Sequence, residues 1–183
     1  MSPDVVAWLR DGLAEYAFRN PGESLDVDEF WALLDHADDI TDPAHYLPGH
    51  LTASAFTLNP NEDSLLLIHH QKLDRWLQPG GHIDGGDVSL ESAALRELAE
   101  ETGVAAVESL GLLDLDVHQI PQRGDVPGHI HYDVRFAFRS RSPTISALDG
   151  VHEAVWAPLD ELGEFDTDDS VLRAALKLRG QIG

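Results

Sequence analysis

The sequence predicts an α/β fold in which a mixed β-sheet lies between helices, with a helical extension at the N-terminus. Two observations predict this class. Segments whose apolar residues alternate with period two, as in strands, stand on both sides of a segment with helical periodicity, residues 89–102. A further helical segment, residues 168–179, closes the chain. Strands that flank a central helix and lead into another helix favour a sheet covered by helices on both faces.

The composition indicates one folded domain of ordinary size with an appended element. The chain has 183 residues, of which 43% are hydrophobic, enough to form a core. It contains no cysteine, which excludes disulfides, thiolate zinc sites and a cysteine nucleophile. The first residues lack the basic start and apolar core of a secretory signal, and no run approaches the roughly 20 apolar residues of a membrane span. We therefore expect a cytoplasmic protein.

The charge balance excludes two classes of partner. Twelve Lys and Arg residues against 33 Asp and Glu residues give a formal net charge of −21. Such a surface repels polynucleotides and anionic lipid, so we expect neither nucleic acid nor membrane as a partner. A small diphosphate bound beside a metal ion is still compatible with this charge, because the ion supplies a local positive field.

The first 47 residues are interpreted as a helical extension. Residues 4–19 and residues 26–37 each place apolar side chains at helical spacing, and Asn-Pro-Gly at 20–22 separates them. A linker containing proline and glycine follows, so we place the boundary between the extension and the main domain, residues 48–183, within it. The sequence leaves two roles open: covering the core of the main domain, or contributing to a homodimer.

The main domain is expected to contain several strands around its central helix. Residues 130–139 alternate most clearly, with His131, Asp133 and Arg135 on the face opposite the aromatic and aliphatic side chains. In the last helix, the residues expected to face inward are Val171, Leu172, Ala175, Leu176 and Leu178. The predicted strands are Leu51–Leu58, Ser64–His70, Val107–His118 (one or two strands), Ile130–Arg139 and Glu153–Ala157.

The central helix carries three carboxylates on one face. Glu97, Glu100 and Glu101 fall within an arc of roughly 100°, because residues i, i+3 and i+4 share a helix face. Exposed like charges at that spacing cost roughly a few tenths of a kcal/mol per pair. A Mg²⁺ ion would reverse the sign of that cost, since it takes carboxylate, phosphate and water oxygens as ligands. The opposite side carries an expected core stripe of Leu95, Leu98, Ala99 and Thr102.

The loop before this helix is rich in glycine and completes a family motif. Its glycines allow a tight bend and a close approach to a ligand, and Ser89 and Gly103 suit the two ends of the helix. The segment resembles the Nudix box, Gly-x5-Glu-x7-Arg-Glu-U-x-Glu-Glu-x-Gly-U, where U is a bulky aliphatic residue. Two departures occur: the first acid is Asp87 instead of Glu, and eight residues separate it from the arginine. The matching residues are Gly81, Arg96, Glu97, Leu98, Glu100, Glu101, Gly103 and Val104.

The resemblance implies a Nudix-like α/β/α sandwich over roughly residues 50–179, and a hydrolase that cleaves a diphosphate linkage in a nucleoside diphosphate joined to another group. Glu97, Glu100 and Glu101, with the carbonyl of Gly81, would hold Mg²⁺, with Mn²⁺ as an alternative. One carboxylate would act as general base.

The resemblance also assigns supporting residues. In the family the first acid, here Asp87, supports the helix and the arginine, so Arg96 would pair with Asp87 or Glu97. Family members often add one more acid from a late loop, as a metal ligand or base. Asp149 and Glu153 are the candidates for this acid, because both precede Trp156 at workable spacings.

The ten histidines offer further candidates. His129 and His131 share a strand face by period two, and His50, His82 and His118 stand at strand ends or in loops. We interpret His82 and His131 as candidate substrate contacts. A second metal site and ordinary loop or edge histidines are the alternatives.

Other function classes receive less support. The chain has no Gly-x-Ser-x-Gly motif, and its glycines match neither a Walker loop nor a dinucleotide fingerprint. A Nudix-fold module that senses a nucleotide without hydrolysing it is the main alternative, although binding alone does not need the complete set of glutamates. A prenyl diphosphate isomerase is disfavoured because the family enzyme uses a catalytic cysteine. The substrate and the number of metal ions are left open.

Overall fold

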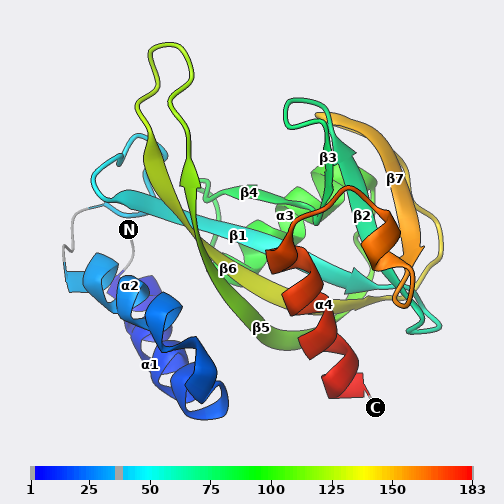
Figure 1. Cartoon of the computed structure of the whole chain (residues 1–183), viewed down its shortest axis with the longest axis horizontal. Coiled ribbons are helices and arrows are strands. Elements are labelled where there is room, and N and C mark those ends of the chain that lie inside the picture. The colour runs from blue at the N-terminus through cyan, green and yellow to red at the C-terminus, as the bar shows by residue number, and fades with distance from the viewer. Residues whose placement is uncertain (1–2, 36–38, 183) are drawn as a thin grey trace.

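A mixed sheet is the centre of the fold in the computed structural model, which describes residues 3–35 and 39–182 (Figure 1). Over these ranges it has the seven strands β1 (Gly49–Leu58), β2 (Ser64–His70), β3 (Arg75–Leu77), β4 (Gly80–His82), β5 (Val107–Ile120), β6 (His129–Ser140) and β7 (Val151–Pro158). The helices are α1 (Pro3–Arg19), α2 (Ser24–Asp35), α3 (Leu90–Thr102) and α4 (Asp169–Ile182), with 3₁₀ turns at Pro21–Glu23 and Leu162–Glu164. None of these helices, as described, is long and apolar enough to cross a membrane.

Strand β1 joins the parts of the sheet. The main order is β3-β2-β1-β6-β5, with β4 paired to β1 and β7 paired to β2. β1 and β6 run parallel along their full pairing, and the other pairs are antiparallel. β4 pairs with the first half of β1, at residues 52–54, whereas β2 meets β1 at its end, where Leu58 is opposite Leu65. The predicted mixed sheet is therefore present.

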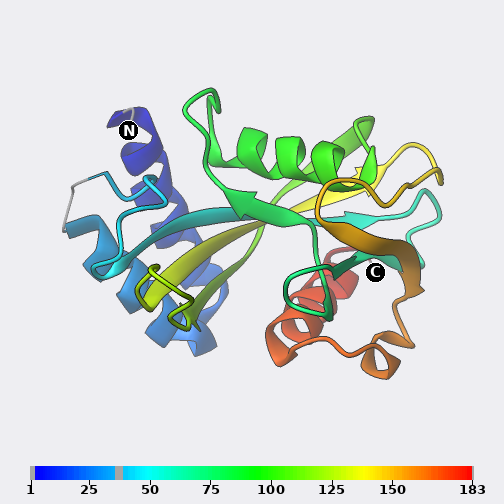
Figure 2. The same cartoon turned by 90° about the horizontal axis from the view of Figure 1, so that it is seen from above.

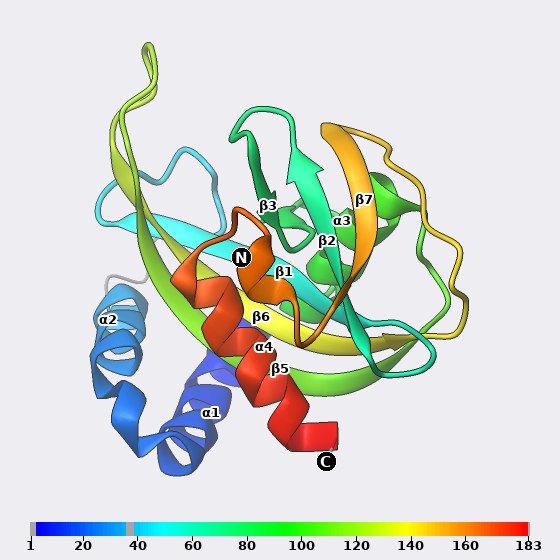
Figure 3. The ribbon, with the colours of Figure 1, turned by 45° about the vertical axis from the view of Figure 1, so that its right-hand side comes forward.

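The two faces of the sheet are covered differently. Leu51, Ala53 and Ala55 of β1 belong to one core cluster with residues of α1, α2 and α3. On the other face, Phe56 and Leu58 belong to a second cluster with residues of α4. Figure 2 shows α3 and α4 on opposite sides of the sheet, and Figure 3 shows α4 crossing β5 and β6. The layers are helix, sheet and helix, as predicted.

The N-terminal helices pack against the sheet. The Trp8 ring of α1 lies 5.8 Å from the Phe136 ring of β6, between centroids, and the Phe30 ring of α2 lies 5.5 Å from the Tyr132 ring. Leu9, Leu13 and Leu33 are fully buried in the same cluster as the sheet residues. The extension therefore covers core of the main domain. The last residues of the second predicted helix, 36 and 37, lie outside the described residues.

The structure decides one alternative of the sequence prediction and corrects another detail. Residues 107–120 form one long strand with bulges, and Gly111 adopts φ +89° at one of them. In α4, Leu176 was expected to face inward but is 67% exposed, whereas Ala174 is buried. The buried stripe follows Val171, Ala174, Ala175 and Leu178, so Leu176 lies off the i, i+3, i+4 pattern.

A buried ion network connects the sheet with α4. The Arg135 side chain is 2% exposed and contacts Asp114 at 3.2 Å, Asp116 at 3.0 Å and Asp133 at 2.9 Å. Burial alone would lower the pKa of Arg135, but the three carboxylates raise it, so the guanidinium stays charged. Arg173 of α4 adds contacts to Asp114 and Asp116. The network satisfies charges that would otherwise be unpaired inside the fold.

Arg135→Met should lower the free energy of unfolding by about 3–5 kcal/mol, because it leaves buried carboxylates without their central cation. Arg139→Met is the matched control on the same strand: Arg139 is more exposed and pairs with Glu62 and Glu108 at the surface. The control should change stability by at most about 1 kcal/mol. Urea denaturation of both variants measures the difference, and equal losses would contradict the role given to the network.

Candidate active site

The helix α3 begins and ends at defined caps. The Ser89 Oγ accepts a hydrogen bond from the Ser92 N–H at 3.0 Å, and the Ser92 Oγ accepts one from the Ser89 N–H at 2.9 Å. At the other end Gly103 adopts φ +73° and donates its N–H to the Ala99 carbonyl at 2.9 Å. Both ends were predicted from the sequence. The caps fix the helix, and they therefore fix the positions from which its glutamates project.

The three glutamates of α3 differ in exposure. Glu101 is only 8% exposed, and its Oε2 accepts a hydrogen bond from the Gly80 N–H at 3.1 Å. Glu97 lies against Gly81 so closely that an added Cβ there would stand 2.6 Å from the Glu97 Oε1. Glu100 is half exposed, at 49% of its side chain. The Pro-Gly-Gly loop therefore contacts two of the carboxylates directly, and Gly81 is the residue that permits the closer contact.

The buried side of α3 differs from the predicted stripe. Leu98 and Thr102 are buried as expected, but Leu95 and Ala99 are only half-buried. Glu101 is buried instead, and its carboxylate accepts a hydrogen bond from Gly80 at the start of β4. Helical periodicity alone could not show this, since it does not place β4 against the helix.

Arg96 joins the loop to the carboxylate face. Its Nε and Nη2 contact the two carboxylate oxygens of Asp87 at 3.2 and 3.0 Å, and Nη2 also donates to the His82 carbonyl at 2.8 Å. Its Nη1 donates to Glu97 at 2.9 Å and to Glu100 at 3.0 Å. The predicted pairing of Arg96 with Asp87 or Glu97 is confirmed for both. Asp87 is shorter than the glutamate of the motif, and one extra residue separates it from Arg96, but the contact between Asp87 and Arg96 still forms.

Crowding and burial disfavour the charged forms of these acids. Burial raises the pKa of Glu101 to about 8, the hydrogen bond from Gly80 opposes this rise, and Glu97 and Glu100 add to it. Burial likewise raises the pKa of Glu97, although the adjacent Arg96 lowers it. The protein without a metal ion therefore holds carboxylates that resist ionising together, and a bound cation would favour their charged forms.

The two late acids have no contact with this carboxylate face. Glu153 lies on β7, opposite His69 of β2, and its side chain is exposed. Asp149 is exposed in the turn before β7, although its neighbour Leu148 donates an N–H to the Glu101 carbonyl at 3.0 Å. Within the described residues neither carboxylate shares a hydrogen-bonding partner with the three glutamates. Their role as an additional acid remains a prediction.

His82 and His131 lie together on the other face of the sheet. In β4, Gly81 is opposite Ala53 and turns toward α3, whereas His82 is opposite Thr52 and turns away from it. The rings of His82 and His131 are 5.5 Å apart between centroids. Burial lowers the pKa of His131 to about 2 and that of His50 to about 4, so both rings are neutral at neutral pH. Contact of these histidines with a substrate remains a prediction.

An open cavity of about 670 Å³ lies on this same face. Gln78 lines the cavity, and its side-chain amide donates to the Ser54 Oγ at 3.3 Å. Gln78 is two residues before Gly80, the residue whose N–H contacts Glu101. The sequence analysis placed Arg135 on the polar face of its strand and named His118, but it missed the other cavity residues, because they come from elements far apart in the sequence, such as β3, β5 and the start of α4. The polar residues lining it include Arg75, Gln78, Asp116, His118, Arg123 and Arg135.

Comparison with known families and sequences adds independent information. The model of the NUDIX domain matches residues 48–177. The "Putative 8-oxo-dGTP diphosphatase" of Bacillus subtilis (strain 168) is 39% identical over 75 residues, which are 40% of this chain and 48% of that protein. The "Probable DHNTP pyrophosphohydrolase" of Lactococcus lactis subsp. cremoris (strain MG1363) is 34% identical over 88 residues, 47% of this chain and 52% of that protein. The match spans about half the length of both relatives.

Solved structures with a similar fold extend over more of the chain. A NUDIX-family hydrolase from Clostridium perfringens superposes with a TM-score of 0.55 at 27% identity, covering 71% of this chain and 96% of that one. The NUDIX domain of Shewanella oneidensis NrtR, solved in complex with ADP ribose, superposes with a TM-score of 0.56 at 23% identity, covering 73% and 88%. At that identity the second likeness concerns the fold alone.

The raised pKa of Glu101 predicts a pH-dependent stability in metal-free protein. In the unfolded chain a glutamate titrates near about 4.3. A group whose pKa is higher in the folded protein than in the unfolded chain stabilises the fold fully at pH values below its unfolded pKa. This stabilisation is lost as the pH rises through the folded pKa. Between about pH 4.3 and pH 8, wild-type stability should therefore fall relative to Glu101→Gln, by up to about 1.4 kcal/mol per pH unit from this group.

Urea denaturation in the presence of a chelator, at about pH 5 and about pH 7.5, tests this expectation. Glu91→Gln is the control on the same helix, since its amide oxygen can still accept the hydrogen bond from Ser109. An unchanged difference between wild type and Glu101→Gln at the two pH values would show that Glu101 is ionised normally.

Proposed function

Because the chain belongs to the Nudix family, as the match over residues 48–177 shows, we propose that it is a Mg²⁺-dependent pyrophosphohydrolase. Its substrate would be a nucleoside diphosphate joined to another group, and the enzyme would hydrolyse the diphosphate linkage of this substrate. The observation that carries the proposal is the carboxylate face of α3, where Glu97 and Glu101 lie against the Gly80-Gly81 backbone and Glu100 stands beside them.

The residues of this face fit a divalent metal ion with oxygen ligands. Glu97, Glu100 and Glu101 offer carboxylate oxygens, and the carbonyl of Gly81 is a candidate for a further oxygen. This donor set suits Mg²⁺, and Mn²⁺ accepts the same ligands. The buried Glu101, whose pKa is raised to about 8, is a carboxylate that needs a nearby cation to ionise at neutral pH. When bound, the ion polarises phosphoryl oxygens and lowers the pKa of a bound water.

The protein's own residues would orient this chemistry. Arg96 holds Glu97 and Glu100 with one nitrogen and Asp87 with the other two, so it positions the face instead of contacting the substrate. The Gly80 N–H fixes Glu101. One carboxylate, with Glu97 as the first candidate, would accept the proton of the attacking water. Asp149 in the turn before β7 and Glu153 on β7 remain the other candidates for that role.

The cavity lies on the face of the sheet away from α3, but Gln78, which lines it, is two residues before Gly80, which contacts Glu101. The substrate is therefore proposed to extend past this edge and to place its remaining group in the cavity. The volume of the cavity, about 670 Å³, falls within the range of roughly 300–1,000 Å³ seen for small-molecule pockets. Arg75 and Arg123 line it together with Asp116, Asp168 and Asp169, and the two arginines are the groups there that would contact an anionic part of the ligand. The names of the two relatives, "Putative 8-oxo-dGTP diphosphatase" and "Probable DHNTP pyrophosphohydrolase", support a nucleotide-like substrate.

A non-catalytic module that senses a nucleotide is the alternative. It would need the cavity but not three convergent carboxylates, so the complete set of Glu97, Glu100 and Glu101 favours the enzyme. A cytoplasmic location, a homodimer and the absence of nucleic acid and membrane partners remain predictions from the sequence.

Glu100→Gln and Glu101→Gln should each lower kcat/KM by about 10²–10³, because each removes a charge that stabilises the transition state through the metal ion. Steady-state kinetics with Mg²⁺ measures the loss, and melting curves of the metal-free variants should show no loss of stability. Glu91→Gln is the control on the same helix and outside the motif. Wild-type turnover by both variants, or an equal loss in the control, would remove these glutamates from the metal site.

Activity should disappear after chelation and return with Mg²⁺ or Mn²⁺, because oxygen-rich sites bind both ions. Product formation would be followed on nucleotide sugars, dinucleoside polyphosphates, oxidised nucleotides and non-nucleotide diphosphates. Full activity in chelated protein would disprove the metal requirement. Saturable binding of a nucleotide without turnover of any member of the panel would favour the sensing module.

A further inference from the structure

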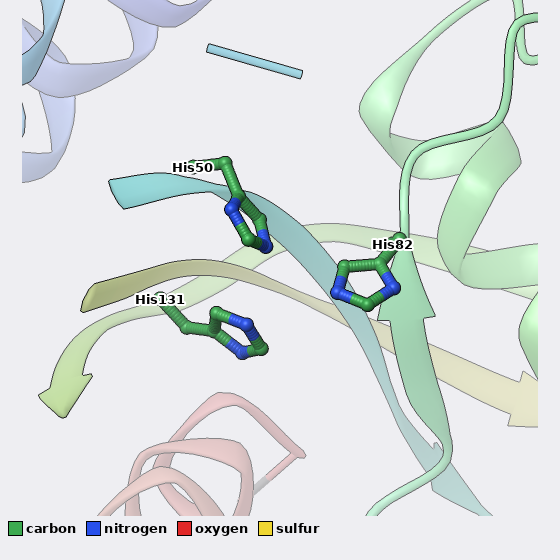
Figure 4. A group of neighbouring side chains, drawn as sticks. All are labelled: His50, His82 and His131. Atoms are coloured by element: carbon green, nitrogen blue, oxygen red, sulfur yellow. The ribbon is translucent and has the colours of Figure 1, made fainter. Parts of the chain in front are cut away.

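We propose that His50, His82 and His131 form a second metal site, which binds a divalent transition ion such as Zn²⁺. One nitrogen from each ring lies within 4.8 Å of the nitrogens from the other two. Figure 4 shows the three rings turned toward a common centre from three different strands. This site does not rest on the proposed hydrolase activity, because none of its ligands belongs to the carboxylate face of α3.

Three paired strands place these histidines. His50 of β1 and His131 of β6 are direct partners in the parallel register, and their ring centroids are 4.7 Å apart. His82 reaches the same face from β4, where it pairs with Thr52 of β1, and its ring is 5.1 Å from that of His50. Sites built on strands hold their ligands more rigidly than sites on loops. The backbone therefore brings the rings together before any ion binds.

His50 has the hydrogen-bonding pattern of a metal ligand. The side chain is fully buried, and its Nδ1 lies 3.2 Å from the His45 carbonyl, which accepts the Nδ1–H. The Nε2 is then left with a lone pair, and it has no hydrogen-bond partner among the described residues. Metal-bound imidazoles usually donate their other N–H to a carbonyl or carboxylate in this way. A buried nitrogen without a partner is costly, and a metal ion would supply the partner.

His129 stands beside the three rings and follows the same pattern. Its Nδ1 lies 2.9 Å from the Pro127 carbonyl, so its Nε2 also carries a lone pair. That Nε2 is 3.2 Å from the Nε2 of His131. Ligand nitrogens of a tetrahedral zinc ion are about 3.4 Å apart, given Zn–N bonds of about 2.0–2.1 Å. His129 is therefore a neighbour of the site through His131, and the three-histidine group leaves a fourth position for water.

The chemistry of the donors selects the ion. Imidazole nitrogens suit Zn²⁺, Cu²⁺ and Ni²⁺, whereas Mg²⁺ prefers oxygen. The widest nitrogen spacing, up to 4.8 Å, needs to close by about 1 Å or more for a tetrahedral ion. His82 is exposed and His131 only half-buried, so both rings have room to rotate. The chain would thus hold two ions of different class on opposite faces of one sheet.

The site also adjoins the cavity. His118, which lines the cavity, has its ring 5.5 Å from that of His131. A transition ion with one open position would place positive charge at this end of the cavity. Anionic groups of a ligand would be attracted to it, in addition to the arginines that line the cavity.

Equilibrium binding of Zn²⁺ to the full chain, stripped of metal and kept in excess Mg²⁺, tests the proposal. We expect one equivalent of tight binding, and Co²⁺ in its place should show the visible absorption of a tetrahedral nitrogen site. His82→Gln and His131→Gln should each weaken binding by about 100-fold or more. His82 is exposed, so its replacement does not threaten the fold.

Two controls separate this site from other binding. His152→Gln removes an exposed histidine on β7, away from the cluster, and should leave Zn²⁺ affinity unchanged. Glu100→Gln should also leave it unchanged, because Glu100 belongs to the carboxylate face. The proposal is overturned if the wild-type chain shows no one-equivalent site, or if His82→Gln and His131→Gln, shown by circular dichroism to be folded, bind Zn²⁺ like the wild type.

Discussion

The contacts of one guanidinium organise the carboxylate face. Arg96 holds Asp87 in the loop, the carbonyl of His82 at the end of β4, and Glu97 and Glu100 on its own helix. A single cation thereby offsets the repulsion that clustered carboxylates would otherwise impose on folding. The same contacts tie the Gly-rich segment to the helix that carries the acids. A lysine could not make these contacts, because only the planar fork of arginine donates in several fixed directions.

The short strand β4 contributes one residue to each of the two candidate sites, which lie on opposite faces of the sheet. Gly81 and His82 are adjacent in sequence, and strand alternation sends them in opposite directions. Gly81 meets Glu97 on the side of α3, whereas His82 meets the histidines on the other side. Behind them, the buried Arg135 network holds β5, β6 and α4 in a fixed relation. The rigidity that metal sites require is thus supplied by pairing and ion contacts in the sheet.

The sequence was informative where the relevant contacts are local. The caps of α3 and the pairing of Arg96 with Asp87 depend on residues within one turn or one loop, and both were predicted correctly. Burial of Glu101 was missed, because it depends on the pairing of β4 with β1, which brings Gly80 against the helix. Convergence of His50 with His131 depends on the parallel pairing of β1 and β6, which are about 80 residues apart. Period-two patterns place a side chain on a face but do not identify its neighbour in space.

Lys177 of α4 links the two ends of the chain. Its ammonium contacts Asp114 of β5 and lies 2.6 Å from both the Tyr16 hydroxyl of α1 and the Glu23 carboxylate. A fragment cut to the matched family region, residues 48–177, would keep the lysine and Asp114 but lose Tyr16 and Glu23. It would also expose the apolar sheet surface that α1 and α2 cover. The region matched by the family model is therefore shorter than the set of described residues that share the buried core, because α1 and α2 contribute to that core.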